Sequence, residues 1–419
     1  MNKRLNCPEN QPIRDWNLQF QTVRLWLDKA YTKGKMMKNV INDKTKIGKQ
    51  DLHPETLMMG YGYDPALSEG SVKPPVFHTS TFAFPTAEAG EAFFNHVSGR
   101  QSLPEGQDPG LIYSRFNHPN AEICEDRLAV LEGADEGVIT ASGMGAITCA
   151  LLAFLRPGDV VVHSGQLYGG TQTLIHGLLD QFGILSAEFD DGQSLPDIMA
   201  AMERGAKLGP VKMIYVETPS NPLNGLIDLD LIKTAADTFG AQSGQRPVTV
   251  CDNTMLGPIF QQAVRQGMDM AVYSLTKYVG GHSDLIAGAV LGSSEHIAKV
   301  RGIRSAMGLN LDPNTSWLLT RSLETVSLRM HRAAYSGRKV ANWLADNPFT
   351  KTRVLHPDFI KDEAYQELLA RQCSGPGSTF SFVVDGGRAE AFKIINGLSL
   401  FKSAVSLGGT ESLISHPAS

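Results

Sequence analysis

Residues 272–284 read Val272-Tyr273-Ser274-Leu275-Thr276-Lys277-Tyr278-Val279-Gly280-Gly281-His282-Ser283-Asp284. The apolar start predicts a β-strand, and the Ser-x-Thr-Lys turn then places Lys277 at the strand end, beside the hydroxyls of Ser274 and Thr276. A lysine amine in such a place can react with an aldehyde cofactor, and hydroxyls can hold a phosphate. Lysines at strand ends are more often solvated surface charges, so this segment needs support from the rest of the chain.

Alternating elements on both sides of this segment indicate the fold class. From Gly137 onward, short β-branched runs alternate with longer amphipathic runs, which predicts an α/β fold with a mostly parallel sheet covered on both faces by helices. Ligands of such sheets bind at the carboxyl ends of the strands. The expected strands are 137–140, 160–163, 213–217, 248–252, 270–274 and 285–291, and the expected helices are 143–155, 171–181, 229–239 and 315–347. Runs at 379–384 and 390–395 predict a smaller C-terminal α+β domain.

Composition excludes several classes of protein. The chain has 419 residues, 42% of them hydrophobic, which suffices for a large core and a second domain. The formal net charge of -5 gives no basic surface for nucleic acid, and no apolar run approaches the ~20 residues of a membrane helix. The cysteines lack any Cys-x-x-Cys spacing, which predicts reduced thiols, a cytoplasmic location and no metal site. They are Cys7, Cys124, Cys149, Cys251 and Cys373.

The first residues differ from the rest. Residues 1–50 are rich in Lys and Asn and lack the apolar core of a secretory signal, and Asp15, Asp28 and Asp43 argue against a targeting peptide. We expect a poorly ordered extension over residues 1–52, with Met36 or Met37 as alternative translation starts.

Three further segments place chemistry at expected strand ends. Asp252 ends a buried strand, where a carboxylate is costly unless it pairs with a cation such as a pyridinium N–H or caps the next segment. Gly143 and Met144 open a helix whose N-terminus suits phosphate, although a plain strand-to-helix turn has the same pattern. Tyr168 follows another strand and can stack on a flat cofactor or simply pack.

Two more segments remain ambiguous on their own. Asn221 can donate to a phenolate oxygen or serve an ordinary turn, and Arg115, close to Tyr113, is either a phosphate ligand or a surface charge. A dinucleotide-binding dehydrogenase is disfavoured, because the third glycine of its fingerprint would fall on Thr148.

Taken in order, these motifs resemble the pyridoxal-phosphate enzymes of cysteine and methionine metabolism, a family that includes cystathionine γ-synthase, cystathionine γ-lyase, methionine γ-lyase and O-acetylhomoserine sulfhydrylase. The resemblance runs from about His53 to Ser419. It implies a fold-type I transferase with a seven-stranded sheet, and γ-elimination or γ-replacement on sulfur amino acids or activated homoserine. It also implies a homodimer with shared active sites, built into a homotetramer.

The same resemblance assigns a role to each motif residue. Lys277 would hold pyridoxal phosphate covalently and later move protons, Asp252 would pair with the ring nitrogen, and Tyr168 would stack on the ring and protonate the leaving group. Asn221 would touch the 3′-oxygen, and Ser406 would lie near the substrate carboxylate. The phosphate contacts implied are Gly143, Met144, Ser274 and Thr276, with Tyr113 and Arg115 reaching the neighbouring subunit's site.

The resemblance also implies boundaries and one departure. We expect an extension (1–52), an arm contacting the partner (53–112), a large cofactor-binding domain (113–314), and a linking helix with a C-terminal domain (315–419). Family members continue past the His-Pro-Ala-Ser that ends this chain, so the expected C-terminal domain is incomplete and its carboxylate-binding arginine unassigned. The alternative function is therefore a catalytically impaired homologue that only binds cofactor or a partner subunit.

Substrate choice stays open at this stage. Gly170 stands where methionine γ-lyases usually have cysteine, and Thr173 where cystathionine enzymes often have arginine. Val405 stands where cystathionine γ-lyase has glutamate, which favours a methionine γ-lyase or a sulfhydrylase. The Gly/Pro-rich loop 99–111 is longer than usual and is expected to shape the partner's pocket entrance.

Overall fold

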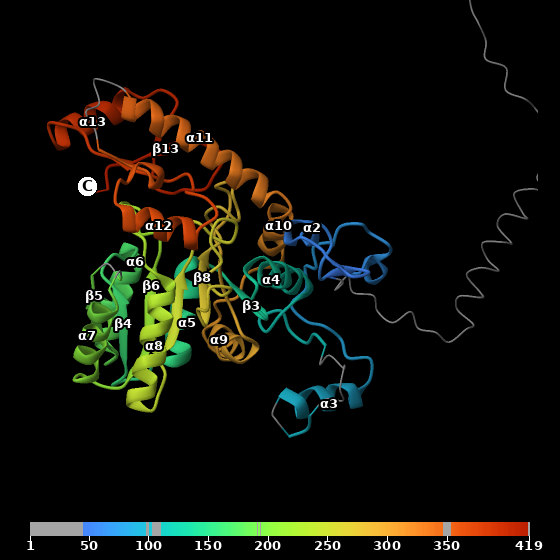
Figure 1. Ribbon diagram of the computed structural model, residues 1–419. Coiled ribbons are helices and arrows are strands. Elements are labelled where there is room, and N and C mark those ends of the chain that lie inside the picture. The colour runs from blue at the N-terminus through green and yellow to red at the C-terminus, as the bar shows by residue number, and fades with distance from the viewer. Residues whose placement is uncertain are drawn as a thin grey trace, which may run out of the picture.

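The structure, a computed structural model, describes residues 45–97, 100–102, 110–190, 192, 194–346 and 353–417. The expected extension up to residue 44, with both alternative start residues Met36 and Met37, lies outside these ranges, as do residues 99 and 103–109 of the expected loop. Figure 1 shows a central sheet with helices packed around it, an N-terminal arm beside it and C-terminal elements above it.

A seven-stranded sheet forms the centre, in the order β3-β9-β8-β7-β6-β4-β5. All neighbours from β8 to β5 pair in parallel, and β9 runs antiparallel to both β8 and β3. The mostly parallel sheet expected from the sequence is therefore confirmed. Its strands are β3 (Glu136–Thr140), β4 (Val160–Ser164), β5 (Leu185–Phe189), β6 (Val211–Glu217), β7 (Val248–Asp252), β8 (Met270–Ser274) and β9 (Gly288–Gly292).

Alternate residues of each strand enter two separate apolar layers. On β4, Val160 and Val162 face one layer, while Val161 faces the other. The period of two in side-chain direction thus buries both faces, as near-continuous apolar strands predict.

Helices cover both faces. One layer is closed by α5 (Gly143–Phe154), α9 (Ser294–Met307) and a π-helical segment (Thr173–Leu179) that continues the short α6 (Gly169–Gln172). The other is closed by α4 (Pro119–Glu132), α7 (Leu195–Ala206), α8 (Leu229–Ser243), α10 (Pro313–Leu323) and the start of α11 (Val326–Asp346). The expected covering of both faces is confirmed.

The remaining elements flank this core. The end of the expected extension forms a short antiparallel pair, β1 (Lys46–Ile47) and β2 (Gln50–Asp51). The arm contains α2 (Pro54–Leu57), a 3-10 turn (Pro65–Ser68) and α3 (Ala87–Val97). The C-terminal elements are β10 (Val354–Leu355), a 3-10 turn (Pro357–Phe359), α12 (Glu363–Gln372), β11 (Ser381–Phe382), α13 (Arg388–Gly397), β12 (Lys402–Ser403) and β13 (Leu413–Ile414). In Figure 1 the C-terminal elements lie over the carboxyl ends of the parallel strands.

Several expected boundaries differ from the structure, and three of the differences have a cause that the contacts show. The helix expected at 171–181 begins at Gly169 and widens into the π-helical segment, where the Thr173 hydroxyl donates to the Gly169 carbonyl, 2.9 Å away. The helix expected at 315–347 is two helices, and Arg329 donates to the Ser322 carbonyl at the end of the first. The strand expected at 285–291 starts at Gly288, because the Thr276 side chain engages the backbone just before it.

Within the described ranges, no helix has both the length and the apolar character needed to span a bilayer.

Candidate active site

Two buried carboxylates meet at the carboxyl-terminal edge of the sheet. Glu217 ends β6 and Asp252 ends β7, and the two residues are direct partners in the parallel pairing. Burial, together with the negative charge of Asp252, raises the pKa of Glu217 to about 8, and burial also raises the pKa of Asp252. Asp252 Oδ1 accepts hydrogen bonds from the Thr254 amide (3.1 Å) and hydroxyl (2.6 Å). These two bonds fix its orientation but bring no positive charge.

This pair fits a cationic ring nitrogen. No Lys or Arg side chain in the described ranges forms an ion pair with Glu217 or Asp252. Uncompensated buried carboxylates are costly, and a protonated pyridine nitrogen is a partner that would remove the cost. The residues present therefore fit pyridoxal phosphate, whose ring N–H Asp252 would hold.

Glu217 also organises the two loops that carry Tyr168 and Asn221. Its carboxylate accepts the Tyr168 amide at 2.6 Å and is bonded to the Asn221 backbone. Tyr168, with 54% of its surface exposed, caps α6, and its ring is free to lie over a flat ligand. Asn221 is exposed in the turn after β6. One carboxylate thus places both predicted ring contacts at one sheet edge.

The residues expected to hold the phosphate lie at the start of α5 and the end of β8. Ser142 caps α5 by accepting the Gly145 amide at 3.0 Å, which leaves the amides of Gly143 and Met144 without an intrahelical acceptor. Gly143 lies so close to Ser274 that an added Cβ would be 2.8 Å from the Ser274 Cβ. The helix N-terminus and the Ser274 hydroxyl are therefore together, as the sequence analysis expected for an anion site.

Thr276 lies in the same turn, with its hydroxyl already engaged. It donates to the Ala287 carbonyl at 3.2 Å and accepts the Ala287 amide at 3.1 Å. A phosphate contact from Thr276 would require the hydroxyl to change partner.

Lys277 lies half-buried above this edge. Its Nζ donates to Ser406 Oγ at 3.1 Å, and burial lowers the pKa of its amine. No carboxylate of the described residues pairs with it. Gly408 packs against the same turn, since an added Cβ there would lie 2.7 Å from the Lys277 carbonyl carbon. The C-terminal segment therefore reaches Lys277, and Ser406, which was predicted to lie near the substrate carboxylate, contacts the lysine directly.

Arg329 on α11 holds the turn from the other side. Its guanidinium donates to the carbonyl oxygens of Tyr278 (2.6 Å) and Val279 (3.0 Å), directly after the lysine. Burial lowers the pKa of Arg329 to about 10. The sequence analysis missed this residue, and a lone arginine inside an amphipathic helix carries no signal that would have revealed it.

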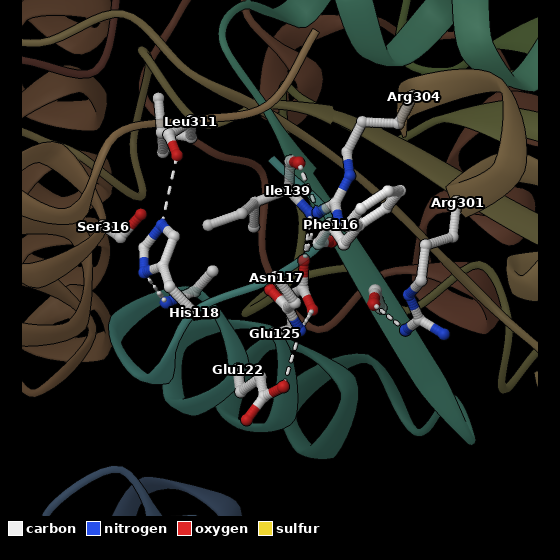
Figure 2. Close-up of polar contacts among 12 residues, drawn as sticks. Phe116, Asn117, His118, Glu122, Glu125, Ile139, Arg301, Arg304, Leu311 and Ser316 are labelled. Atoms are coloured by element: carbon white, nitrogen blue, oxygen red, sulfur yellow. Dashed lines mark hydrogen bonds and ion pairs between the residues drawn. The ribbon is translucent and has the colours of Figure 1, made fainter. Parts of the chain in front are cut away.

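Tyr113 and Arg115 directly follow the arm, on a firmly anchored segment. Figure 2 shows the buried Arg304 between the Glu125 carboxylate (2.9 Å) and the Phe116 carbonyl, and His118 bonded to the Leu311 carbonyl (3.2 Å). Arg115 itself donates to the Ser305 carbonyl at 2.7 Å, and its guanidinium lies 4.5 Å from the Phe116 ring centre. Tyr113 is 40% exposed. The Arg115 side chain is thus held at the surface of α9 (Ser294–Met307), while the Tyr113 ring lies 6.5 Å from the Phe116 ring.

Glu217 offers a test through pH. The folded Glu217 carboxyl holds its proton up to about pH 8, whereas the unfolded one loses it near its ordinary value of 4.5. The folded state therefore binds more protons between these values, and its stability should fall as the pH rises, by up to about 1.4 kcal/mol per pH unit. Glu217→Gln should flatten this dependence in cofactor-free protein, measured by urea unfolding from about pH 5.5 to about pH 8. The exposed Glu203→Gln is the control, and an equal slope in both variants would refute the argument.

A sheet of this order, with a half-buried lysine, a helix N-terminus and paired carboxylates at one edge, defines a pyridoxal-phosphate-dependent enzyme of fold type I. The chain belongs to the Cys/Met metabolism PLP-dependent enzyme family, whose family model matches residues 55–419.

Relatives agree with this assignment. The chain is 36% identical to an L-methionine gamma-lyase of Pseudomonas deceptionensis over 382 residues, 90% of this chain and 89% of the relative. It is 34% identical to an O-succinylhomoserine sulfhydrylase of Pseudomonas aeruginosa, over 84% of this chain and 81% of the relative. The crystal structure of cystathionine gamma synthase from Xanthomonas oryzae, in complex with aminoacrylate and cysteine, superposes with a TM-score of 0.76 at 32% identity, covering 88% of each chain. The expected class, γ-elimination or γ-replacement dependent on pyridoxal phosphate, is confirmed.

Glu217 is the main site residue that the sequence analysis left without a role. A signal was present, since Glu217 ends its strand just as Asp252 does. Only the pairing of β6 with β7 shows that the two carboxylates are neighbours.

Proposed function

We propose that this chain catalyses γ-elimination from a thioether amino acid with a small uncharged γ-substituent, as a methionine γ-lyase does. The observation that carries the proposal is the half-buried Lys277, free of any acid partner among the described residues and in contact with Ser406, at the sheet edge that holds Asp252. A lysine in this setting loses its proton more readily than a solvated one and can accept the Cα proton of a substrate.

The remaining steps fall to residues around it. Pyridoxal phosphate, when bound, supplies an electron sink for negative charge at Cα and Cβ. Asp252 keeps the ring nitrogen protonated, and Arg329 fixes the backbone that follows Lys277. The exposed hydroxyl of Tyr168 donates a proton to the departing thiol, which is general-acid catalysis. Gly143, Met144 and Ser274 hold the phosphate, and Ser406 orients the substrate near Lys277.

Two positions favour a small substituent. Thr173 is uncharged and its hydroxyl donates to its own helix, and Val405, next to Ser406, is an apolar side chain. A second carboxylate on the substrate would find no cation at either place. The second candidate is γ-replacement on an O-acylhomoserine, which the similarity to the sulfhydrylase favours.

A substrate panel separates these functions. The cofactor-loaded protein should release 2-oxobutanoate, ammonia and a thiol from methionine alone, measured by mass spectrometry. Formation of cystathionine from O-succinylhomoserine and cysteine, without products from methionine, would instead establish the synthase reaction. A loaded cofactor with no product from any of these substrates would support the impaired homologue.

We also propose a homodimer with shared sites, assembled into a homotetramer in the reducing cytoplasm. The four described cysteines are free thiols, in keeping with that compartment. In Figure 1, α3 lies away from the sheet and the helices that cover it, and we propose that the arm, residues 53–112, contacts the partner. Tyr113 and Arg115 would then face the neighbouring subunit's phosphate site.

Mixing two inactive variants tests the shared site. Lys277→Ala and Arg115→Ala proteins are dissociated together and reassembled. If the two residues act in one site across the interface, hybrid dimers contain one intact site, and random pairing should restore about a quarter of wild-type activity. A mixture no more active than the separate variants would show that both residues serve the same chain's site. The unmixed variants, taken through the same procedure, are the controls.

A further inference from the structure

A second polar cluster lies on the sheet outside the candidate active site. It consists of His163 on β4, Glu188 on β5 and His176 in the π-helical segment, and one potential ligand atom of each lies within 4.8 Å of the others. His163 and Glu188 are direct partners in the parallel pairing of β4 and β5. The three residues therefore converge from three different elements.

His163 is completely buried, and only one of its ring nitrogens is satisfied. Nδ1 lies 2.9 Å from the Ser164 carbonyl oxygen, so Nδ1 carries the proton and donates it there. Nε2 then presents a lone pair, and it has no hydrogen-bond partner among the described residues. Leaving a buried polar atom unpaired costs about 1–3 kcal/mol.

The arrangement of His163 is the one that metal-bound histidines adopt. Such histidines usually donate the ring N–H that does not face the metal to a carbonyl or carboxylate, which orients the other nitrogen.

The other two side chains are adjustable. The His176 ring lies 5.1 Å from the His163 ring, at an angle of 67°, and its Nδ1 is 3.4 Å from the Ser186 hydroxyl on β5. His176 and Glu188 are both exposed. In a tetrahedral zinc site the bonds are about 2.0–2.2 Å long, so the ligand atoms are about 3.4 Å apart. Rotation of the two exposed side chains can bring the three ligand atoms, now within 4.8 Å of one another, to the separation of about 3.4 Å that zinc requires.

We propose that His163, His176 and Glu188 form a binding site for a divalent transition-metal ion of the zinc class. Two imidazoles and one carboxylate are a donor set that suits zinc, whereas calcium and magnesium prefer oxygen ligands alone. The exposed side of the cluster leaves a position for water. The expectation of no metal rested on cysteine spacing, and histidines from separate elements leave no such pattern in the sequence.

The position suggests a structural role for the ion. It would connect β4 and β5 to the π-helical segment that follows α6, the helix that Tyr168 caps. The bound ion therefore fixes this segment on the sheet and takes no part in the reaction at Lys277.

Binding of Zn²⁺ alone tests the site. The cofactor-loaded wild type is compared with His176→Ala, Glu188→Gln and the control His96→Ala, which removes a histidine from α3. Equilibrium dialysis with metal analysis should find one bound Zn²⁺ per chain in the wild type and the control. Loss of an outer partner of a metal-bound histidine typically weakens binding about 10- to 100-fold, so loss of a ligand should weaken it at least about tenfold in both variants.

A second readout guards against misfolding. Each variant must keep its bound cofactor and its melting temperature without metal, and Zn²⁺ should raise the melting temperature of the wild type and the control only. Absence of saturable Zn²⁺ binding to the wild type would overturn the site. So would unchanged affinity in either His176→Ala or Glu188→Gln, because the proposal requires both ligands.

Discussion

Lys277→Ala should abolish turnover, lowering kcat by at least about 10⁴-fold. The residue is expected to serve both as the covalent attachment and as the acid–base group, and acid–base catalysis alone contributes about 10²–10⁴-fold. Lys277 is half-buried, and its Nζ donates a hydrogen bond to Ser406 Oγ. No carboxylate of the described residues forms an ion pair with it, so the fold does not need its charge. The loss should therefore appear in activity and leave the fold intact.

The measurement compares initial rates on the best substrate of the panel with thermal unfolding. Lys207→Ala, which removes an exposed lysine at the end of α7, is the matched control and should retain full activity. A Lys277→Ala protein that keeps more than a small fraction of wild-type kcat would place the chemistry on another residue.

Asp252→Asn should have the second largest effect. The substitution keeps the shape and the bonds to Thr254 but removes the negative charge that we propose faces the cofactor's ring nitrogen. Removing one partner of a buried charge pair costs about 2–5 kcal/mol, so cofactor affinity should fall by at least about 30-fold. The rate should fall as well, because the ring is then a weaker electron sink.

Titration of cofactor-free protein with pyridoxal phosphate gives the affinity, and initial rates at saturating cofactor give the second effect. Asp197→Asn, an exposed aspartate in the first turn of α7, is the control. If Asp252→Asn binds the cofactor as tightly as the control does, Asp252 is only the cap of the turn at Thr254, which is the alternative that the sequence allowed.

Most of the sheet was predictable because its strands carry a strong local pattern, although β5 was not among the expected strands. Strands such as β7 and β8 are apolar and β-branched and end in polar residues, and both were predicted with the bounds that the structure has. The site residues at the strand ends follow from the same rule, since parallel strands bring their carboxyl ends to one edge. Resemblance to a family then assigned their roles.

What the sequence could not show depends on contacts between distant segments. Glu217 meets Asp252 only through strand pairing, and Arg329 meets the lysine turn only because α11 packs beside it. The histidine cluster likewise needs β4, β5 and the π-helical segment in place. The predicted helix boundaries were wrong where a side chain, such as that of Thr173 or Arg329, donates a hydrogen bond to a backbone carbonyl. Local helix propensity does not predict such bonds.

The most direct test of the central claim is to locate the cofactor chemically. The protein is incubated with pyridoxal phosphate, reduced with borohydride, digested and analysed by peptide mass spectrometry. We predict a single pyridoxyl adduct on Lys277, together with loss of that adduct in Lys277→Ala. An adduct on another lysine, or none on Lys277 in folded protein, would contradict the account of the site.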